Sequence, residues 1–129
     1  MPVHSFDYDS DYPGPAFPVV ELGIKGSNGH REIVTAFVDS GADATLIPPS
    51  LLRKVGGRKL DTRWARNISG VRYRVSMYQV TLTIGSLDFY GIEAIANSQT
   101  DEVIVGRDVL NQLVVILNGL AGETTVSDR

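Results

Sequence analysis

Short apolar stretches separated by glycine- and proline-containing turns run along most of the chain. The longest of them, residues 71–84, alternates apolar and polar side chains with a period of two, which is the pattern of a strand with one buried face. The other stretches are rich in β-branched residues, which favour strands. Strands are therefore predicted over residues 19–25, 32–38, 44–47, 71–84, 87–96, 103–105 and 114–117.

The pattern indicates helix in only two places. Ser50 follows two prolines and can cap a single helical turn over residues 51–54, before the glycine pair that begins at Gly56. Residues 108–113 can form a second short helix near the end of the chain. Many short strands with glycine turns and so little helix indicate a compact all-β domain, either a closed barrel or a sandwich.

The two ends of the chain depart from this pattern. Residues 1–18 are rich in Asp, Tyr and Pro, and the three prolines between residues 13 and 18 remove backbone donors and fix φ. We therefore expect an extended acidic arm over residues 1–18, a domain over residues 19–119, and a polar tail over residues 120–129.

Composition suits one globular domain. The chain has 129 residues, of which 43% are hydrophobic and 21% charged, so it can bury a core. The absence of cysteine excludes disulfides, thiolate metal sites and a cysteine nucleophile. No leader-like pattern and no run of eighteen apolar residues is present. The expectation is a cytoplasmic protein that needs no cofactor or metal and does not bind a membrane.

Charge is distributed unevenly along the chain. Residues 53–74 contain eight basic side chains and one Asp, a net charge of +7, although the whole chain carries −3. Such a segment is most often a solvated face, and the alternatives are contacts with an acidic peptide or a nucleic acid. The low pI of about 5.2 and the lack of regular aromatic spacing argue against nucleic acid. The basic residues are Arg53, Lys54, Arg58, Lys59, Arg63, Arg66, Arg72 and Arg74.

An acidic turn interrupts the apolar pattern between residues 37 and 47. The apolar pair 37–38 ends at Asp39, Ser40 and Gly41, and a second apolar run follows at once. Burying an ionised carboxylate is costly unless it is paired or hydrogen-bonded. Asp39 is therefore either a satisfied structural residue or a reactive one.

Other chemistries lack the residues they need. The two histidines, His4 and His30, fall in the arm and in a predicted turn, so neither is expected beside Ser40 as a general base. The sequence around Ser40 also lacks the first glycine of a nucleophile elbow. No cluster of His and carboxylates has the spacing of a zinc site. Carboxylates remain as the candidate catalytic groups.

Two segments resemble the signatures of retropepsin-like aspartic proteases. Residues 37–45 resemble the hydrophobic-D-[S/T]-G-A motif of this family. Residues 103–110, an apolar strand followed by Gly106 and a short helix, resemble its second signature, some sixty residues further on. The similarity extends from about residue 19 to residue 117. It implies a closed β-barrel or sandwich with a flap hairpin and one short C-terminal helix.

The resemblance also implies a mechanism and a partner. Two carboxylates about 3 Å apart cannot both ionise, so they share a proton, and one acts as base on a water while the other acts as acid. No other Asp of this chain precedes Ser-Gly or Thr-Gly. The second carboxylate is therefore expected from another copy, in a homodimer with both Asp39 side chains at its axis. The implied substrate is an extended polypeptide.

Neighbouring residues take supporting roles by the same resemblance. Ser40 would brace the paired turns through its hydroxyl, Gly41 would present its backbone to substrate, and Ala42 completes the loop. Asp43 would form a bidentate ion pair with Arg107 that holds the loop on the C-terminal helix. The alternative for this pair is two separate surface charges.

The resemblance places the flap hairpin between residues 66 and 78. Its tip would be Asn67, Ile68, Ser69 and Gly70, which contains one glycine where viral flaps are glycine-rich. The basic segment beside this tip would favour acidic substrates, or would let the acidic arm fold across the cleft as an inhibitory strand. The terminal strands of the viral dimers have no clear match in residues 121–129.

Three functions follow from these observations. The first is a homodimeric aspartic endopeptidase with Asp39 as its catalytic residue. The second is a catalytically weak or inactive retropepsin-like module for dimerisation or peptide binding. The third is a structural β-domain in which Asp39 is buried and satisfied.

Overall fold

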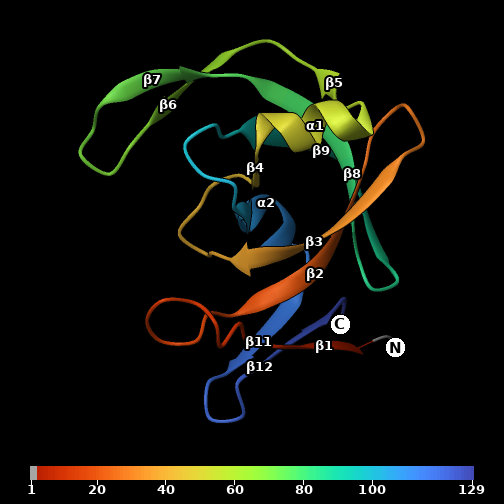
Figure 1. The fold of residues 1–129 in the computed structure, drawn as a ribbon, viewed down its shortest axis with the longest axis vertical. Coiled ribbons are helices and arrows are strands. Elements are labelled where there is room, and N and C mark those ends of the chain that lie inside the picture. Colours follow the sequence, from red (N-terminus) through yellow and green to blue (C-terminus); the bar gives the residue numbers. More distant parts are fainter. Residues whose placement is uncertain (1–2) are drawn as a thin grey trace.

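A ring of six strands forms the centre of the molecule in the computed structural model, which describes residues 3–129 (Figure 1). The order around the ring is β2-β3-β10-β4-β9-β8, and pairing between β2 and β8 closes it. The prediction of an all-β fold with a closed barrel is confirmed. The elements are β1 Val3–Asp7, β2 Val19–Lys25, β3 Arg31–Val38, β4 Leu46–Ile47, α1 Pro49–Val55, β5 Arg58–Lys59, β6 Arg63–Arg66, β7 Arg72–Val75, β8 Met77–Ile84, β9 Leu87–Ala96, β10 Val103–Val105, α2 Arg107–Leu110, β11 Val114–Asn118 and β12 Glu123–Ser127.

The alternating strands supply the core of the barrel. In β8, Val80, Leu82 and Ile84 are buried, while the residues between them are less so. Because successive side chains of a strand point to opposite faces, this period-two pattern places one apolar row inside. Leu22 and Ile24 of the neighbouring strand β2 are fully buried in the same core.

The parallel pairing of β10 with β3 determines where the acidic turn lies. Strand β10 lies between β3 and β4, and its residue Val105 is in register with Val38, the last residue of β3. Parallel strands leave a sheet at the same edge. The loop after β3, which begins at Asp39, is therefore brought beside the turn after β10, which begins at Gly106.

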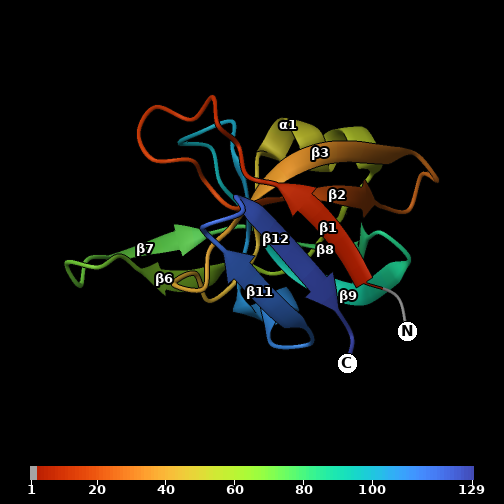
Figure 2. The same cartoon turned by 90° about the horizontal axis from the view of Figure 1, so that it is seen from below.

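The ends of the chain correct two expectations. Instead of an unpaired arm and a polar tail, β1 pairs with β12, which also pairs with β11, in a three-stranded antiparallel sheet (Figure 2). In its middle strand β12, Val126 is buried as part of the barrel core, and the polar residues Thr124 and Ser127 are buried as well. Beyond β1, Asp9 pairs with Phe17, so this part of the arm folds back on itself. Met1 and Pro2 of the expected arm lie outside the described residues.

Several element boundaries differ from the sequence prediction. Ser50 does not cap α1, because the helix begins earlier, with Pro48 at the N-cap and a proline in the first turn. The predicted strand 71–84 is divided into β7 and β8, because the chain leaves the barrel at Ser76. Helix α2 covers residues 107–110, the first part of the predicted helix and the residue before it.

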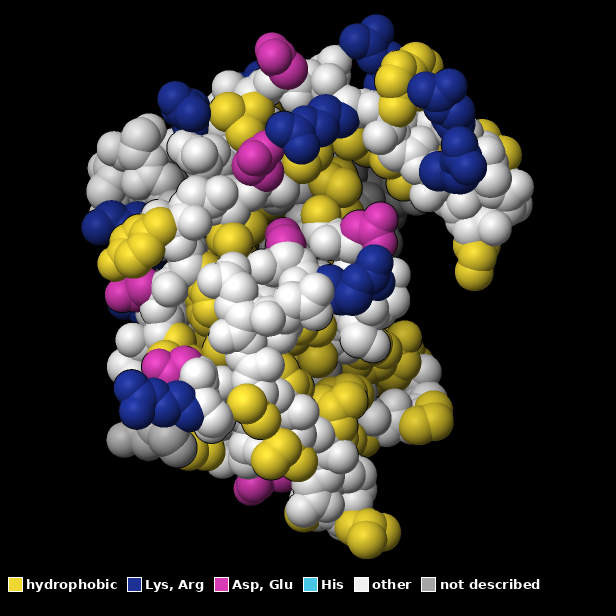
Figure 3. All heavy atoms as spheres, turned by 180° about the vertical axis from the view of Figure 1, so that it is seen from behind, with side chains coloured by type: hydrophobic (Ala, Val, Ile, Leu, Met, Phe, Trp, Pro, Cys, Tyr) yellow, Lys and Arg dark blue, Asp and Glu magenta, His cyan; other side chains and the backbone are white. Residues whose placement is uncertain are grey.

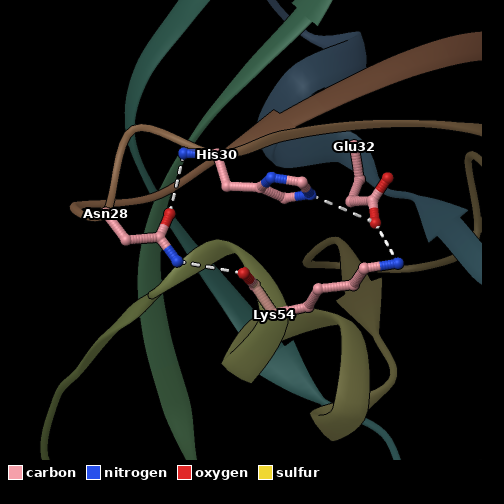
Figure 4. Close-up of polar contacts among 4 residues, drawn as sticks. All are labelled: Asn28, His30, Glu32 and Lys54. Atoms are coloured by element: carbon pink, nitrogen blue, oxygen red, sulfur yellow. Dashed lines mark hydrogen bonds and ion pairs between the residues drawn. The ribbon is translucent and has the colours of Figure 1, made fainter.

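A polar cluster joins the β2–β3 turn to α1 (Figure 4). Asn28 accepts a hydrogen bond from the backbone N–H of His30 and donates one to the carbonyl of Lys54, at 2.8 and 3.0 Å. The Lys54 ammonium and, less strongly, the His30 ring hydrogen-bond to the Glu32 carboxyl and hold its pKa below the ordinary value. This link is therefore present above the usual pKa of Glu and is lost as pH falls through the lowered pKa.

Candidate active site

The loop from Asp39 to Thr45, called the acidic loop below, connects β3 to β4. Hydrogen bonds to Asp39 hold its first turn together. The Asp39 N–H donates to the carbonyl of Val105 at 3.1 Å, which ties the loop to β10. The Asp39 carboxylate Oδ1 accepts the N–H of Gly41 at 2.9 Å, and its carbonyl accepts the N–H of Ala42 at 3.2 Å. The Asp39 residue is half-buried. The carboxylate is thus oriented by its own turn and still reaches the surface.

Arg107 joins the loop to α2. Its Nη1 donates to the carbonyl of Ser40 at 2.7 Å, and its Nη2 forms an ion pair with Asp43. The expected contact between Asp43 and Arg107 is therefore present, but it is not bidentate, because the guanidinium divides its donors between a carboxylate and a carbonyl. The Arg107 N–H also donates to the carbonyl of Ala42 at 2.9 Å. Arg107 thus contacts three residues of the loop, Ser40, Ala42 and Asp43.

The ion pair itself is exposed. The Arg107 side chain is 42% exposed and that of Asp43 is 90% exposed. Ion pairs in such surroundings contribute little to stability, because water screens them. This contact therefore fixes the position of the loop and contributes little to the free energy of unfolding.

The residue that the sequence analysis missed is Asp108, which anchors the far end of the loop. Its carboxylate accepts the Thr45 Oγ1–H at 2.8 Å, the Thr45 N–H at 2.9 Å and the Val109 N–H at 2.9 Å. Thr45 is fully buried, and its hydroxyl also accepts the N–H of Gly106 at 3.3 Å. The only signal in the sequence was a carboxylate just after the second signature glycine.

Close backbone contact explains the glycine of the second signature. A Cβ at Gly106 would lie 2.6 Å from the carbonyl carbon and oxygen of Ala44 and 2.9 Å from the carbonyl of Ala42. These are backbone atoms that cannot rotate away. Gly106 therefore allows α2 to begin directly against the acidic loop.

A hollow of about 420 Å³ lies between the acidic loop and the β6–β7 hairpin. The space-filling view shows a notch between this hairpin and the body of the molecule (Figure 3). Asp39 is not among the lining residues, whereas residues 41–44 of its loop are. The lining residues are Gly41, Ala42, Asp43, Ala44, Leu46, Arg63, Trp64, Ala65, Arg66, Tyr73, Val75, Met77 and Ile95.

The expected tip residues form the turn between β6 and β7. The Asn67 carboxamide oxygen accepts the N–H groups of Ser69 and Val71, and Gly70 has a positive φ of 84°. Ile68 is fully exposed. These residues lie at the end of the hairpin and do not line the hollow. The structure therefore brings the hairpin strands, but not its tip, to the acidic loop.

Two features are absent from the described part of the chain. Residues 3–129 contain no group of three or more His, Asp or Glu side chains that would hold a metal ion. Within the same residues, no helix is long and apolar enough to cross a membrane.

The closed barrel and the Asp-Ser-Gly loop are features of the retropepsin-like aspartic protease family. A family model described as "gag-polyprotein putative aspartyl protease" matches residues 26–112, which include both the acidic loop and α2. The chain belongs to this family. No curated protein matches it in sequence.

Solved structures share the fold at low sequence identity. A retropepsin-like aspartic protease from Rickettsia conorii is 14% identical, with a TM-score of 0.65, and the match covers 97% of this chain and 91% of that one. The EIAV protease complexed with the inhibitor HBY-793 is 19% identical, with a TM-score of 0.60, and the match covers 78% of this chain and 90% of that one. At these identities the similarity concerns the fold.

Proposed function

We propose that this protein is a homodimeric aspartic endopeptidase whose two Asp39 carboxyls, one from each subunit, activate a water. The observation that carries the proposal is the Asp39 loop itself. A half-buried carboxylate ends a barrel strand, in a loop that is held from both sides by Arg107 and Asp108. The family membership of the chain supports a protease.

The reaction needs two such carboxyls. Two carboxylates held about 3 Å apart cannot both carry a charge, so the pair holds one proton. The ionised member removes a proton from the attacking water while the protonated member donates to the oxygen of the scissile carbonyl. The loop hydrogen bonds described above orient each carboxylate before substrate arrives, which lowers the cost of reaching the reactive geometry.

The hollow beneath the β6–β7 hairpin is the proposed place for the substrate. An extended peptide can lie along a free strand and be recognised through its backbone and alternate side chains. In this proposal Gly41 presents its backbone to the peptide, and the tip residues Asn67, Ile68, Ser69 and Gly70 act as a flap that closes over it. The exposed side chain of Ile68 then becomes covered by substrate or by the other subunit.

We also propose that strand β11 contributes to the subunit interface. It is one of the two edge strands of its sheet, and Val114, Ile116 and Leu117 are exposed there, with Leu120 just beyond. Exposed apolar side chains that gather on one edge are typical of an interaction surface. A second copy of the chain is the occupant that the catalytic proposal requires, because one copy supplies one Asp39.

Ile116→Asp tests this interface. We expect the variant to remain folded but to be monomeric at micromolar concentration, and to lose peptide hydrolysis, because a charge on β11 cannot be desolvated in the dimer. Light scattering and a peptide-cleavage assay measure the two effects. Ile33→Asp is the matched control, since Ile33 and Ile116 are both 56% exposed and both lie on strands. A dimeric, active Ile116→Asp variant would remove β11 from the interface.

Arg107→Gln tests the position of the acidic loop. We expect the free energy of unfolding to fall by no more than about 1 kcal/mol, because the ion pair is exposed. The value of kcat/KM should fall by roughly 10- to 100-fold, because small displacements of catalytic groups are costly. Denaturant unfolding and steady-state kinetics give the two quantities, with Arg58→Gln as control. Equal kcat/KM for Arg107→Gln and the unchanged protein would contradict the positioning role.

A further inference from the structure

One face of the β6–β7 hairpin gathers an aromatic ring and three arginines. Trp64 is paired with Arg74, and Arg66 with Arg72, across the two strands. Because side chains alternate along a strand, these four lie on the face opposite that of Ala65, Tyr73 and Val75. We call Trp64, Arg66, Arg72 and Arg74 the outer face of the hairpin. All four residues are exposed.

The ring of Trp64 holds two of these arginines in place. The guanidinium carbon of Arg72 is 4.7 Å from the centre of the ring, and that of Arg74 is 5.8 Å from it. Both distances are within the range of cation–π attraction. Arg74 also donates to the Thr62 hydroxyl at 2.9 Å. The guanidinium groups are therefore oriented before any partner binds.

No carboxylate neutralises this face within residues 3–129. The ion pairs of the described residues include Arg63 with Glu93, on the other face of the hairpin, but none with Arg66, Arg72 or Arg74. Like charges directly opposite each other on two strands repel, as Arg66 and Arg72 do here. An anionic partner would relieve this repulsion. Dark-blue basic side chains are prominent over the hairpin in Figure 3.

We propose that the outer face of the hairpin is a docking site for an acidic stretch of polypeptide. Its centre is Arg72 and Arg74, which do not line the hollow, whereas Trp64 and Arg66 also line the hollow, so the two sites adjoin. Arg72 and Arg74 are two residues apart on one strand, so their side chains project about 6.8 Å apart. An extended peptide with a carboxylate at every second position has the same spacing, and guanidinium groups bind carboxylates through paired donors. Because the partner is a polypeptide, the site deepens the proposed protease function by selecting acidic substrates.

A peptide fits this surface better than a nucleic acid. The chain outside residues 53–74 carries a net charge of −10, which would repel a long polyanion that extends beyond the hairpin. Base stacking needs an open aromatic face. Two guanidinium groups already lie over the Trp64 ring. A short acidic peptide needs neither the rest of the surface nor that ring.

Trp64 is the single tryptophan of the chain, so its fluorescence reports on the outer face and on the adjoining part of the hollow, which Trp64 also lines. The experiment titrates the Asp39→Asn chain, which cannot consume the probe by the proposed mechanism, with a ten-residue peptide of alternating Glu and Ser. We expect a saturable change in emission, with affinity falling roughly tenfold when salt is raised from about 0.05 to 0.5 M. A peptide of alternating Gln and Ser should produce no change. Equal binding of the two peptides would overturn the proposal.

Matched substitutions test whether the Glu peptide binds at the outer face of the hairpin. Arg72→Gln combined with Arg74→Gln should weaken binding of the Glu peptide by roughly tenfold or more, because charge-assisted hydrogen bonds are lost. Arg53→Gln combined with Arg58→Gln removes the same charge from the basic segment outside the hairpin. An equal loss in this control pair would show non-specific attraction and contradict the docking site. Tighter binding of a twelve-nucleotide single-stranded DNA than of the Glu peptide would overturn it in favour of nucleic acid.

The binding assay is independent of hydrolysis. A chain that binds the Glu peptide at the outer face but cleaves nothing would retain this docking site and contradict the proposed protease function. In an active enzyme, Arg72→Gln combined with Arg74→Gln should raise KM for a substrate with an acidic extension. It should leave kcat unchanged, because docking occurs away from the reacting atoms. The same KM for extended and plain substrates would contradict docking during turnover.

Discussion

Asp39→Asn is expected to reduce peptide hydrolysis by roughly 10²- to 10⁴-fold, the range typical of removing a general acid or base. The Asn side chain retains the oxygen that accepts the Gly41 N–H, so the turn should keep its shape. It cannot take the proton of a water. Steady-state kinetics on an extended peptide and thermal unfolding measure activity and folding in the same samples.

Thermal unfolding of Asp39→Asn distinguishes a structural role of Asp39 from a catalytic one. If Asp39 were a purely structural residue, Asp39→Asn would lower the unfolding temperature and would have no activity to remove. If the pair of carboxyls forms in a dimer, the substitution removes a repulsion between them, so dimer stability should be unchanged or increased. Asp101→Asn, in an exposed loop, is the control. Unchanged hydrolysis in Asp39→Asn would end the proposal of an aspartic protease mechanism.

Asp108→Ala is expected to lower the free energy of unfolding by roughly 3 kcal/mol, because buried donors lose their acceptor. The carboxylate is the partner of both the N–H and the hydroxyl of Thr45, which is fully buried, and of the Val109 N–H. Urea unfolding at one fixed protein concentration measures the change and avoids an effect of dimer dissociation.

The matched control for this prediction is Asp88→Ala. Asp88 also accepts a hydrogen bond from a threonine hydroxyl, that of Thr83 at 3.0 Å, but at an exposed position. Its loss should change stability by no more than about 0.5 kcal/mol, since water can solvate the freed hydroxyl. The loss of stability in Asp108→Asn should fall between those in Asp108→Ala and Asp88→Ala, because Asn keeps one acceptor and turns an amide donor toward Thr45. Equal effects of Asp108→Ala and Asp88→Ala would contradict the anchoring role.

Strands with strong local patterns could be predicted from the sequence alone. The bounds of β2, β9 and β10 match the prediction, because each is an apolar or alternating run bounded by turn residues. The terminal strands β1 and β12 were not predicted. They are short and polar in part, and their pairing joins Val3 to Ser127 across nearly the whole chain. No local pattern carries that information.

The candidate site divides in the same way. The Asp-Ser-Gly turn is a local signature, and it identified Asp39 without knowledge of the fold. The contact of Arg107 with Asp43 was expected only from the family resemblance. That the Arg107 guanidinium divides its donors between Asp43 and the Ser40 carbonyl is visible only in the folded structure. The role of Asp108 was missed because its partner Thr45 is 63 residues away in sequence. Its place in a short helix gave no reason to expect burial against the loop.

The sequence by itself determined the class of fold and indicated Asp39 as the candidate catalytic carboxylate, because strand periodicity and the acidic turn are properties of neighbouring residues. The tertiary structure alone decided which groups surround that turn. The parallel register of β10 with β3 places Gly106, Arg107 and Asp108 against the acidic loop. It also decided that Arg66, Arg72 and Arg74 share a face of the hairpin with Trp64. The first result depends on closing the whole barrel, and the second on the register of the β6–β7 hairpin, which is a separate sheet.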